Sequence, residues 1–388
     1  DSRRIRQMRV VLREQYWNKR IGDSQDARRT VMELCNLGRR LLELKSSAVV
    51  LEFIFGGCNS LDDYSSFLTP DRLDDLYGNI DGAFVGLGIE MKADKPRGML
   101  LVKVLSDSPA EIGGLRAGEY ITVIDGTSCL KMTTDEAAKL LRGPSASRVR
   151  LTIHNARTNR DWQHTFVRRS VQVKSVTVVK MIDPERGIGY IQMTGFQKTT
   201  PRELKQAIAQ LKADGMRAVI WDLRGNPGGL LTASIKVLEQ FIGHGVLVET
   251  RGRAHNQDFS YRAGAFNNAN RLPLVLLVDG DSASASEIVA GAIRDHRRGT
   301  IVGRQTYGKW SVQTILPLTN STGLRLTTAR FYSPHGHSLG KIGVRPDLVV
   351  AKSDFNETPR VRDETFHPET DVDIQQGLGI LRKQLAVK

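Results

Sequence analysis

The chain has 388 residues, of which 40% are hydrophobic and 25% charged, and this composition excludes disorder over most of its length. Two or three domains fit such a length. The formal net charge is +14, but the basic residues are spread along the chain, so we expect a solvated basic surface and no nucleic-acid partner. The longest apolar run, residues 272–278, has the length of a strand and is too short to cross a bilayer.

The three cysteines, Cys35, Cys58 and Cys129, lie far apart and form no C-x-x-C pair. This spacing argues against structural zinc and against a disulfide framework, and we expect no metal or other cofactor. The sequence begins at Asp1 without a methionine or an apolar signal region. We therefore expect any targeting segment to have been removed.

Apolar side chains recur at helical spacing in residues 1 to about 55, which predicts amphipathic helices there. Gly56 and Gly57, followed by a turn-rich run to Phe67, are expected to end this segment. A short helix is predicted to begin near Pro70, because proline is favoured in the first helical turn.

Residues 82–172 predict a small sheet of five or six strands with one helix. The helix has clear boundaries, since Thr133 and Glu136 form a capping-box pattern and Gly143-Pro144 ends it. The predicted strands are residues 85–91, 99–104, 120–124, 149–154 and 162–168.

After this block, strands and helices alternate, which predicts an α/β fold in which helices cover a sheet. The predicted strands are residues 188–193, 218–222 and 272–278. The predicted helices are residues 201–214, 234–242, 285–295 and a terminal one at 373–385.

Residues 276–287 run from a buried strand through a turn of small residues into a helix. Such a junction exposes a side chain beside the free N–H groups of a helix N-terminus, where developing negative charge is stabilised. Ser284 is the candidate nucleophile at this junction. Capping alone also explains Ser284 and Glu287, because their spacing is that of a capping box.

A serine nucleophile needs a base, and histidine is the usual one. His296 lies on the same predicted helix as Ser284, about 18 Å further along it, and is out of reach. His335 and His337 remain open as bases. Lys309, in a loop between two predicted strands, can serve instead if burial lowers its pKa from about 10.4 toward neutrality.

Gly86, Leu87, Gly88 and Ile89, together with residues 107–126, resemble a PDZ domain of the bacterial protease-associated type. Glycines there let successive N–H groups turn toward a terminal carboxylate, while the next strand offers an edge to a bound peptide. We expect Leu87, Ile89 and Leu141 to line an apolar pocket. Arg142 resembles an arginine that couples peptide docking to the active site in some relatives, although an exposed arginine at a helix end is the simpler interpretation.

Six separated segments resemble the carboxy-terminal processing peptidases, or tail-specific proteases, a Ser/Lys serine protease family. This resemblance implies a protease core of the ClpP/crotonase-like type with an inserted PDZ domain. It gives a helical segment at 1–75, the PDZ domain at 76–172, the core at 173–350 and a C-terminal segment at 351–388. The segments are residues 62–67, 221–229, 282–288, 306–309, 331–336 and 343–347.

By position, the resemblance makes Ser284 the nucleophile, Lys309 the general base and Gln313 the residue that orients the lysine. An offset of four on a strand would keep Lys309 and Gln313 on one face. The N–H groups of Gly229, Gly228 and Ala285 are expected to form the oxyanion hole. Where the family pattern has a glycine after the lysine, this chain has Trp310, which either shields Lys309 from water or displaces it.

The resemblance therefore implies an endopeptidase that recognises free, apolar protein C-termini and works in the periplasm or cell envelope of a bacterium. Membrane association and oligomerisation stay open. One alternative is a peptide-binding scaffold whose Ser/Lys dyad is spoiled by Trp310. Another is a core that acts on thioesters, although no coenzyme-A-binding signature is visible.

Overall fold

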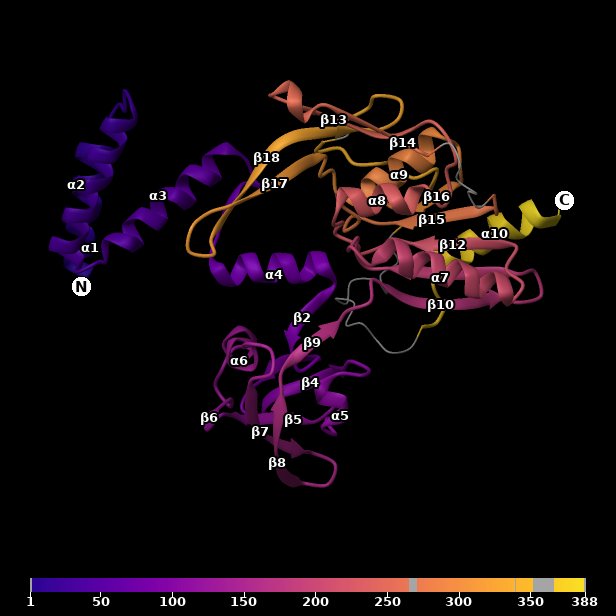
Figure 1. Ribbon diagram of the computed structural model, residues 1–388, viewed down its shortest axis with the longest axis horizontal. Coiled ribbons are helices and arrows are strands. Elements are labelled where there is room, and N and C mark those ends of the chain that lie inside the picture. Colours follow the sequence, from indigo (N-terminus) through magenta and orange to yellow (C-terminus); the bar gives the residue numbers. More distant parts are fainter. Residues whose placement is uncertain (1, 265–270, 339, 352–365, 387–388) are drawn as a thin grey trace. The chain divides into compact units, whose positions relative to one another are not determined.

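The computed structural model describes residues 2–264, 271–338, 340–351 and 366–386 (Figure 1). Two compact units divide the chain. The first consists of Asp1–Asp74, Thr250–Phe259 and Ser311–Phe331, and the second of Asp75–Glu249, Ser260–Trp310 and Tyr332–Lys388.

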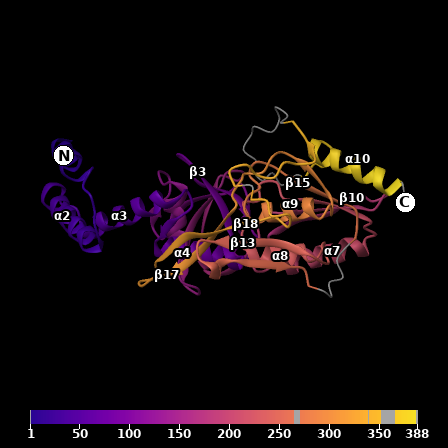
Figure 2. The ribbon, with the colours of Figure 1, turned by 90° about the horizontal axis from the view of Figure 1, so that it is seen from above.

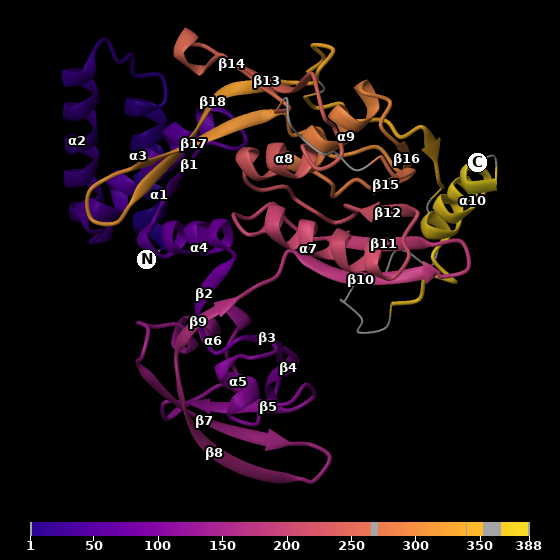
Figure 3. The same ribbon diagram turned by 45° about the vertical axis from the view of Figure 1, so that its right-hand side comes forward.

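The first unit begins with helices and continues into a sheet (Figure 3). Its helix α3 runs through Gly56 and Gly57, so the predicted end at these glycines was wrong. A glycine costs a helix about 1 kcal/mol, which does not end one whose neighbouring turns are already formed. The helices are α1 (Ser2–Val11), the π-helical η1 (Leu12–Tyr16), α2 (Ser24–Leu42) and α3 (Ser46–Leu61).

The sheet after these helices has the strand order β1-β18-β13-β14, with β17 also paired to β18. Both β1 and β17 run antiparallel to β18. The strands are β1 (Ser66–Leu68), β13 (Val246–Gly252), β14 (Phe259–Arg262), β17 (Ser311–Pro317) and β18 (Gly323–Tyr332), with the 3-10 turn η2 (His255–Gln257) between β13 and β14.

Helix α4 (Pro70–Asp81) begins at the predicted proline. Strand β2 (Ala83–Gly86) pairs antiparallel with β9 (Arg169–Gln172). The residues between these two strands form a six-stranded sheet. The order of this sheet is β3 (Ile89–Asp94), β4 (Gly98–Val104), β5 (Tyr120–Ile124), β7 (Arg148–Asn155) and β8 (Arg160–Val167), with β6 (Thr127–Ser128) beside β5. Two helices complete it, α5 (Pro109–Ile112) and α6 (Thr134–Leu141).

The capping box that was predicted for α6 is confirmed, since the Thr133 N–H donates to Glu136 at 2.8 Å and the Glu136 N–H donates to the Thr133 hydroxyl at 3.3 Å. The prediction of one strand at residues 85–91 was wrong, because β2 and β3 are separated at Leu87 and Gly88. Gly88 has φ +80°, and a Cβ atom there would lie 2.3 Å from the Ser108 Cβ. The chain therefore turns where a continuous strand was expected.

The core sheet of the second unit is mostly parallel, with only β10 and β11 antiparallel. Its order is β10 (Val176–Asp183), β11 (Ile188–Met193), β12 (Ala218–Asp222), β15 (Leu274–Val278), β16 (Thr300–Gly303) and β19 (Leu348–Val349). The helices that cover it are α7 (Thr200–Ala213), α8 (Leu231–Leu238), α9 (Ala285–Asp295) and α10 (Val372–Ala386). Figure 2 shows α10 on the opposite side of this sheet from α7 and α8.

Strands β12 and β15 are buried along their whole length, as parallel strands covered on both faces must be. The helix that was predicted at residues 234–242 is shifted, since α8 ends at Leu238 and the Phe241 N–H closes a tighter turn onto the Leu238 carbonyl at 2.9 Å. In the described part of the chain, no helix combines the length and apolar character that crossing a membrane requires.

Candidate active site

Ser284 lies between the buried strand β15 and the first residue of α9. Its backbone has φ 55° and ψ −112°, a conformation that residues other than glycine rarely adopt. The Glu287 half of the expected capping box is present, since the Ser284 N–H donates to the Glu287 carboxylate at 2.9 Å, while the Glu287 N–H donates at 2.9 Å to the backbone carbonyl oxygen of Ser284. The strained turn holds Ser284 at the positive end of the helix dipole.

The three serines of this segment differ in their surroundings. Ser282 and Ser286 are fully buried, and their hydroxyls donate to the carbonyl oxygens of Leu223 at 2.8 Å and Asn226 at 2.9 Å. Ser284 is partly exposed. Two of the serines thus bind a neighbouring loop, and the third keeps part of its surface exposed.

Glu287 is fully buried, and its carboxylate accepts four hydrogen bonds from neutral groups. The Thr306 hydroxyl and the Gly308 N–H donate to Oε1 at 2.6 and 2.7 Å. The Lys309 N–H donates to Oε2 at 2.8 Å, and the Ser284 N–H reaches the same oxygen at 2.9 Å. One carboxylate oxygen therefore holds the main chain of Ser284 and of Lys309 side by side.

The loop that carries Lys309 is also fixed from its other side. Gly308 has φ +94°, and its carbonyl oxygen accepts the Lys341 N–H at 2.8 Å. Thr306 exchanges hydrogen bonds with Val344, at 3.1 Å through its N–H and at 2.7 Å through its hydroxyl. Lys309 itself is half-buried and comes two residues before β17.

The glycine-rich loop after β12 approaches the same turn. A Cβ atom on Gly228, which has φ +102°, would lie 2.8 Å from the Ser284 Cβ and 2.9 Å from the Ala285 nitrogen. The Gly228 N–H already donates to the Asn226 side chain at 2.9 Å. Within the described residues, the N–H groups of Gly229 and Ala285 have no acceptor, so these two of the three expected groups are available to an oxyanion.

Asn226 organises this loop, and sequence reasoning assigned it no role. It is fully buried, and its amide donates to the Met193 carbonyl at 2.9 Å. Its own carbonyl oxygen accepts the Ala283 N–H at 3.0 Å and the Ser286 hydroxyl at 2.9 Å. The available signal was an asparagine among glycines directly after a buried strand, where a polar side chain must satisfy backbone groups.

A buried charge network, also missed from the sequence, supports the start of the glycine-rich loop. Arg224 pairs with Asp222 at 2.6 Å, with Asp373 at 2.7 Å and with Asp371 at 2.9 Å. Burial lowers the pKa of Arg224, but the neighbouring carboxylates, Asp222 foremost, raise it well above its usual value. The Tyr190 hydroxyl donates to Asp222 at 2.7 Å. Helix α10, which carries Asp373, is thereby tied to the strand end from which the loop departs.

Two histidines, His335 and His296, lie near the far end of α9 from Ser284. The His335 N–H donates to Asp295 at 2.9 Å, and Asp295 ends α9, about 16 Å along the helix from Ser284. Burial raises the pKa of Asp295, but hydrogen bonds from Ser333 and His335 outweigh it and lower the pKa below its usual value. His296 contacts the Val246 carbonyl oxygen at 2.7 Å at this same end. Neither His335 nor His296 is placed to serve Ser284.

Gln313 belongs to the first unit, on β17, and its side-chain amide donates to Thr327 at 2.9 Å and to Ser311 at 3.2 Å. The strand argument for a shared face with Lys309 was wrong. Lys309 precedes β17, and the pairing of β17 with β18 shifts between Val312 and Gln313. A bulge of this kind breaks the two-residue alternation on which the argument depended.

The second glycine loop, between β2 and β3, has the features of an anion site. The carbonyl oxygens of Leu87 and Gly88 accept the N–H groups of Ala110 and Leu105, both at 2.9 Å. Among the described residues, the N–H groups of Leu87 and Gly88 have no acceptor. Strand β3 is the edge of its sheet and α6 contacts it, so a peptide edge is open.

The other residues that were predicted to bind peptide differ in their surroundings. Leu87 and Leu141 are buried in the core of the small sheet, and Ile89 packs against that core. Gly86 ends β2 opposite Arg169. Arg142 is exposed at the end of α6, as the simpler interpretation expected, and it pairs with Asp75 at 2.8 Å.

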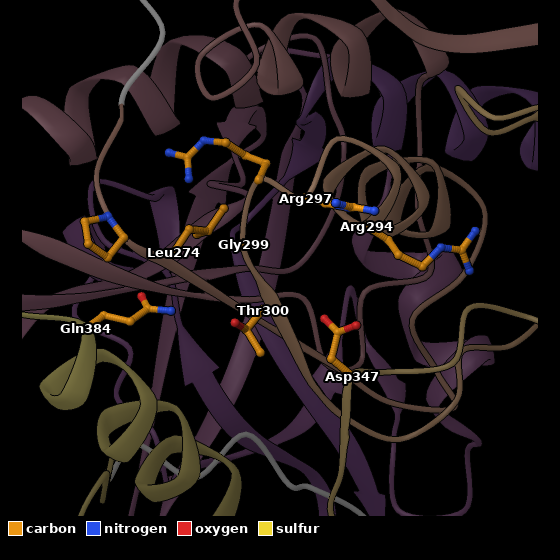
Figure 4. A pocket seen from close by; sticks show the side chains of 9 residues that line it. Leu274, Arg294, Arg297, Gly299, Thr300, Asp347 and Gln384 are labelled. Atoms are coloured by element: carbon orange, nitrogen blue, oxygen red, sulfur yellow. The ribbon is translucent and has the colours of Figure 1, made fainter. Parts of the chain in front are cut away.

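The cavity in Figure 4 has a volume of about 260 Å³ and lies at the C-terminal end of α9, away from Ser284. Arg294, Arg297 and Arg298 line part of it, but Arg298 is held by the carbonyl oxygens of Phe241 and Leu272 at 2.8 and 3.0 Å. None of the predicted site residues lines this cavity. The cavity is therefore separate from the turn that carries Ser284.

Comparison with known proteins assigns two segments of the chain to families. Residues 187–350 match Peptidase family S41, and residues 102–155 match a PDZ domain. A carboxy-terminal-processing protease of Bartonella bacilliformis is 40% identical over 298 residues, which are 75% of this chain and 67% of that protein. A carboxyl-terminal-processing protease of Synechocystis is 32% identical over 327 residues, 84% of this chain and 74% of that protein.

Among solved structures, the photosystem II D1 C-terminal processing protease is 29% identical, with a TM-score of 0.50. The alignment covers 89% of this chain and 92% of that one. The family matches and the alignments with these relatives include both the core and the small sheet. The chain belongs to the carboxy-terminal-processing proteases, serine peptidases of family S41 that carry a PDZ domain.

Proposed function

We propose that this serine peptidase binds the free, apolar C-terminus of a protein at its PDZ domain and cleaves the chain with a Ser284/Lys309 dyad. The observation that carries the dyad is the Glu287 carboxylate, whose Oε2 accepts the N–H groups of both Ser284 and Lys309. A buried carboxylate with neutral donors is stable only when its hydrogen bonds are well formed, so it fixes the two residues together.

In the proposed reaction, the neutral Lys309 amine removes the Ser284 hydroxyl proton while Oγ attacks the scissile carbonyl carbon. The N–H groups of Gly229 and Ala285 donate to the oxyanion of the tetrahedral intermediate. The Lys309 ammonium then protonates the leaving amine. Water, deprotonated by the same lysine, hydrolyses the acyl-enzyme. Gln313 as the residue that orients the lysine stays a prediction.

The PDZ part of the proposal rests on the open N–H groups of Leu87 and Gly88 and on the free edge of β3. A terminal carboxylate would accept from these N–H groups, and the preceding peptide would add to β3. We place the helical segment at residues 1–75, the PDZ domain at 76–172, the core at 173–350 and the terminal segment at 351–388. We also propose that the protein works outside the bacterial cytoplasm.

Fluorophosphonate labelling with mass spectrometry tests the dyad. We expect the label on Ser284, and we expect neither labelling nor cleavage in Ser284→Ala. Lys309→Ala should lose as much activity as Ser284→Ala, because a nucleophile and its base act as a unit. Lys309→Arg should also fail, because a guanidinium stays protonated.

Lys205→Arg, on the exposed face of α7, is the matched control and should cleave normally. Cleavage by Ser284→Ala would overturn the assignment, and activity in Lys309→Arg would point to His337. An unlabelled protein that still binds C-terminal peptides would instead be the peptide-binding scaffold. The open N–H groups of the PDZ loop are the observation that favours peptide binding as the second candidate function.

A further inference from the structure

We infer that Trp310 is a positioning residue that presses Lys309 against the helix of the nucleophile. The inference rests on the proposed Ser284/Lys309 dyad and concerns the position at which this chain departs from the expected glycine. Trp310 is 3% exposed, although it directly follows the half-buried Lys309.

The indole ring of Trp310 lies against α9 at Gly291. A Cβ atom at Gly291 would be 3.1 Å from Cη2 of the ring and 3.7 Å from Cζ2. A Cβ atom at the same position would also lie 3.5 Å from the Ser333 Cβ. The absence of a side chain at Gly291 therefore makes the space that the six-membered part of the indole fills.

Ser284, Glu287 and Gly291 are three and four residues apart, so they succeed one another along a single face of α9. Glu287 holds the N–H groups of Gly308 and Lys309 through its carboxylate. One helical turn later, Gly291 receives the ring of Trp310. Lys309 is thus fixed by two contacts with α9, the hydrogen bonds to Glu287 and the packing of Trp310 on Gly291. Both contacts lie on the face of α9 that begins at Ser284.

The chain enters the first unit at Ser311, directly after Trp310. Trp310 is thus the last residue of the second unit in this stretch. Its buried ring is the last contact that holds the loop carrying Lys309. A large, nearly immobile side chain at this point keeps the Lys309 backbone in place independently of strand β17. In the proposed arrangement, removing the ring would admit water beside Lys309, and water favours the charged form of an amine.

The first test replaces the ring in two steps. Trp310→Phe keeps an aromatic side chain and should retain kcat within about threefold, whereas Trp310→Gly should lower kcat about tenfold or more with little change in KM. In Trp310→Gly the ascending limb of the pH profile of kcat/KM should move to higher pH. Trp17→Gly is the control, because Trp17 is 80% exposed.

The second test fills the space at Gly291. Gly291→Ala places a methyl group against the ring and should lower kcat about tenfold. The double variant Gly291→Ala/Trp310→Phe should recover most of that loss, because phenylalanine lacks the outer edge of the indole. Gly379→Ala on α10 is the control, since nothing lies within 4 Å of the added atom.

Thermal unfolding of every variant separates packing from positioning. A fall in Tm with an unchanged pH limb, or losses in the double variant that simply add, would overturn the inference. The failure of the proposed function looks different. In that case the wild-type protein would not be labelled at Ser284, or Lys309→Arg would remain active.

Discussion

Two glycine loops in the second unit each leave a pair of backbone N–H groups without an acceptor among the described residues, but they are built differently. At Gly88 the missing side chain makes room for Ser108, a residue of the same small sheet domain. At Gly228 it makes room for Ser284 itself, more than fifty residues away in sequence. The conformation of the loop at Gly88 therefore depends on contacts within its own domain. The conformation of the loop at Gly228 depends on the turn that carries Ser284.

This difference separates two kinds of anion recognition. A terminal carboxylate carries its charge before and after it binds, so under the proposed function the PDZ loop would contribute to the binding of substrate. An oxyanion exists only during reaction, so the loop at Gly228 and Gly229 would contribute to the rate of the chemical step. Changes in the first loop should raise KM, and changes in the second should lower kcat.

The largest effect is expected for Gly228→Ala. The new Cβ would meet Ser284 and Ala285 within 3 Å, at a backbone φ of +102°, and would displace the oxyanion donors. We expect kcat to fall about a hundredfold or more, with the folded protein preserved. Steady-state kinetics measure this, and Gly225→Asn, at φ +68° in the same loop with open space around it, should keep most of the activity. A change in KM alone would contradict the comparison.

Gly88→Ala should affect binding instead. The added methyl group would lie 2.3 Å from the Ser108 Cβ at φ +80°, and the loop must shift its N–H groups to relieve the contact. We expect KM for a C-terminal peptide to rise about tenfold while kcat changes little, which steady-state kinetics and peptide-binding titration can measure. Gly126→Asn, in an open turn of the same domain at φ +81°, is the control. An equal loss of kcat would show that the two loops act as one.

Amidating the substrate tests the PDZ loop without changing the protein. Removing the terminal charge costs the loop its charge-assisted hydrogen bonds, each worth about 1.5 to 3 kcal/mol. We expect kcat/KM for the amidated peptide to fall about tenfold or more relative to the free acid, at 1.4 kcal/mol per decade. In Gly88→Ala the two peptides should be cleaved at similar rates. Equal rates on the unaltered protein would mean that the loop does not read carboxylates.

The smallest effect is expected for the ion pair of Arg142 and Asp75. Both side chains are about half exposed, and such pairs contribute about 0 to 1 kcal/mol. Arg142→Ala and Asp75→Asn should each change kcat/KM less than about fivefold, and the double variant should lose no more than either one. Measuring all three at low and high salt checks this, because screening should remove the effect. A loss of tenfold or more in Arg142→Ala alone would support a coupling role.

Much of the fold could be read from local patterns. The bounds of β11, β12 and α9 match the prediction because apolar runs end at charged or small residues there. What could not be read depends on partners far apart in sequence. Arg224 and Asp373 are separated by 149 positions, and the sequence around either residue does not predict that the two form an ion pair.

The candidate site shows the same limit. Glu287 was visible as a capping residue, but its bonds to Gly308 and Lys309 come from a loop more than twenty residues later. The bulge before Gln313 depends on how β17 pairs with β18, which no local pattern reports. Residue types thus indicated the chemistry, whereas tertiary contacts decide the geometry.

Glu287 binds Ser284 and Lys309 through their backbone N–H groups, and these hydrogen bonds do not involve either side chain. Under the proposed mechanism, replacing either side chain should remove reactivity and leave these backbone hydrogen bonds in place. A Ser284→Ala protein should consequently keep a substrate-shaped site and hold its targets uncut. Such a variant can serve as bait that captures physiological substrates from a cell extract for identification by mass spectrometry.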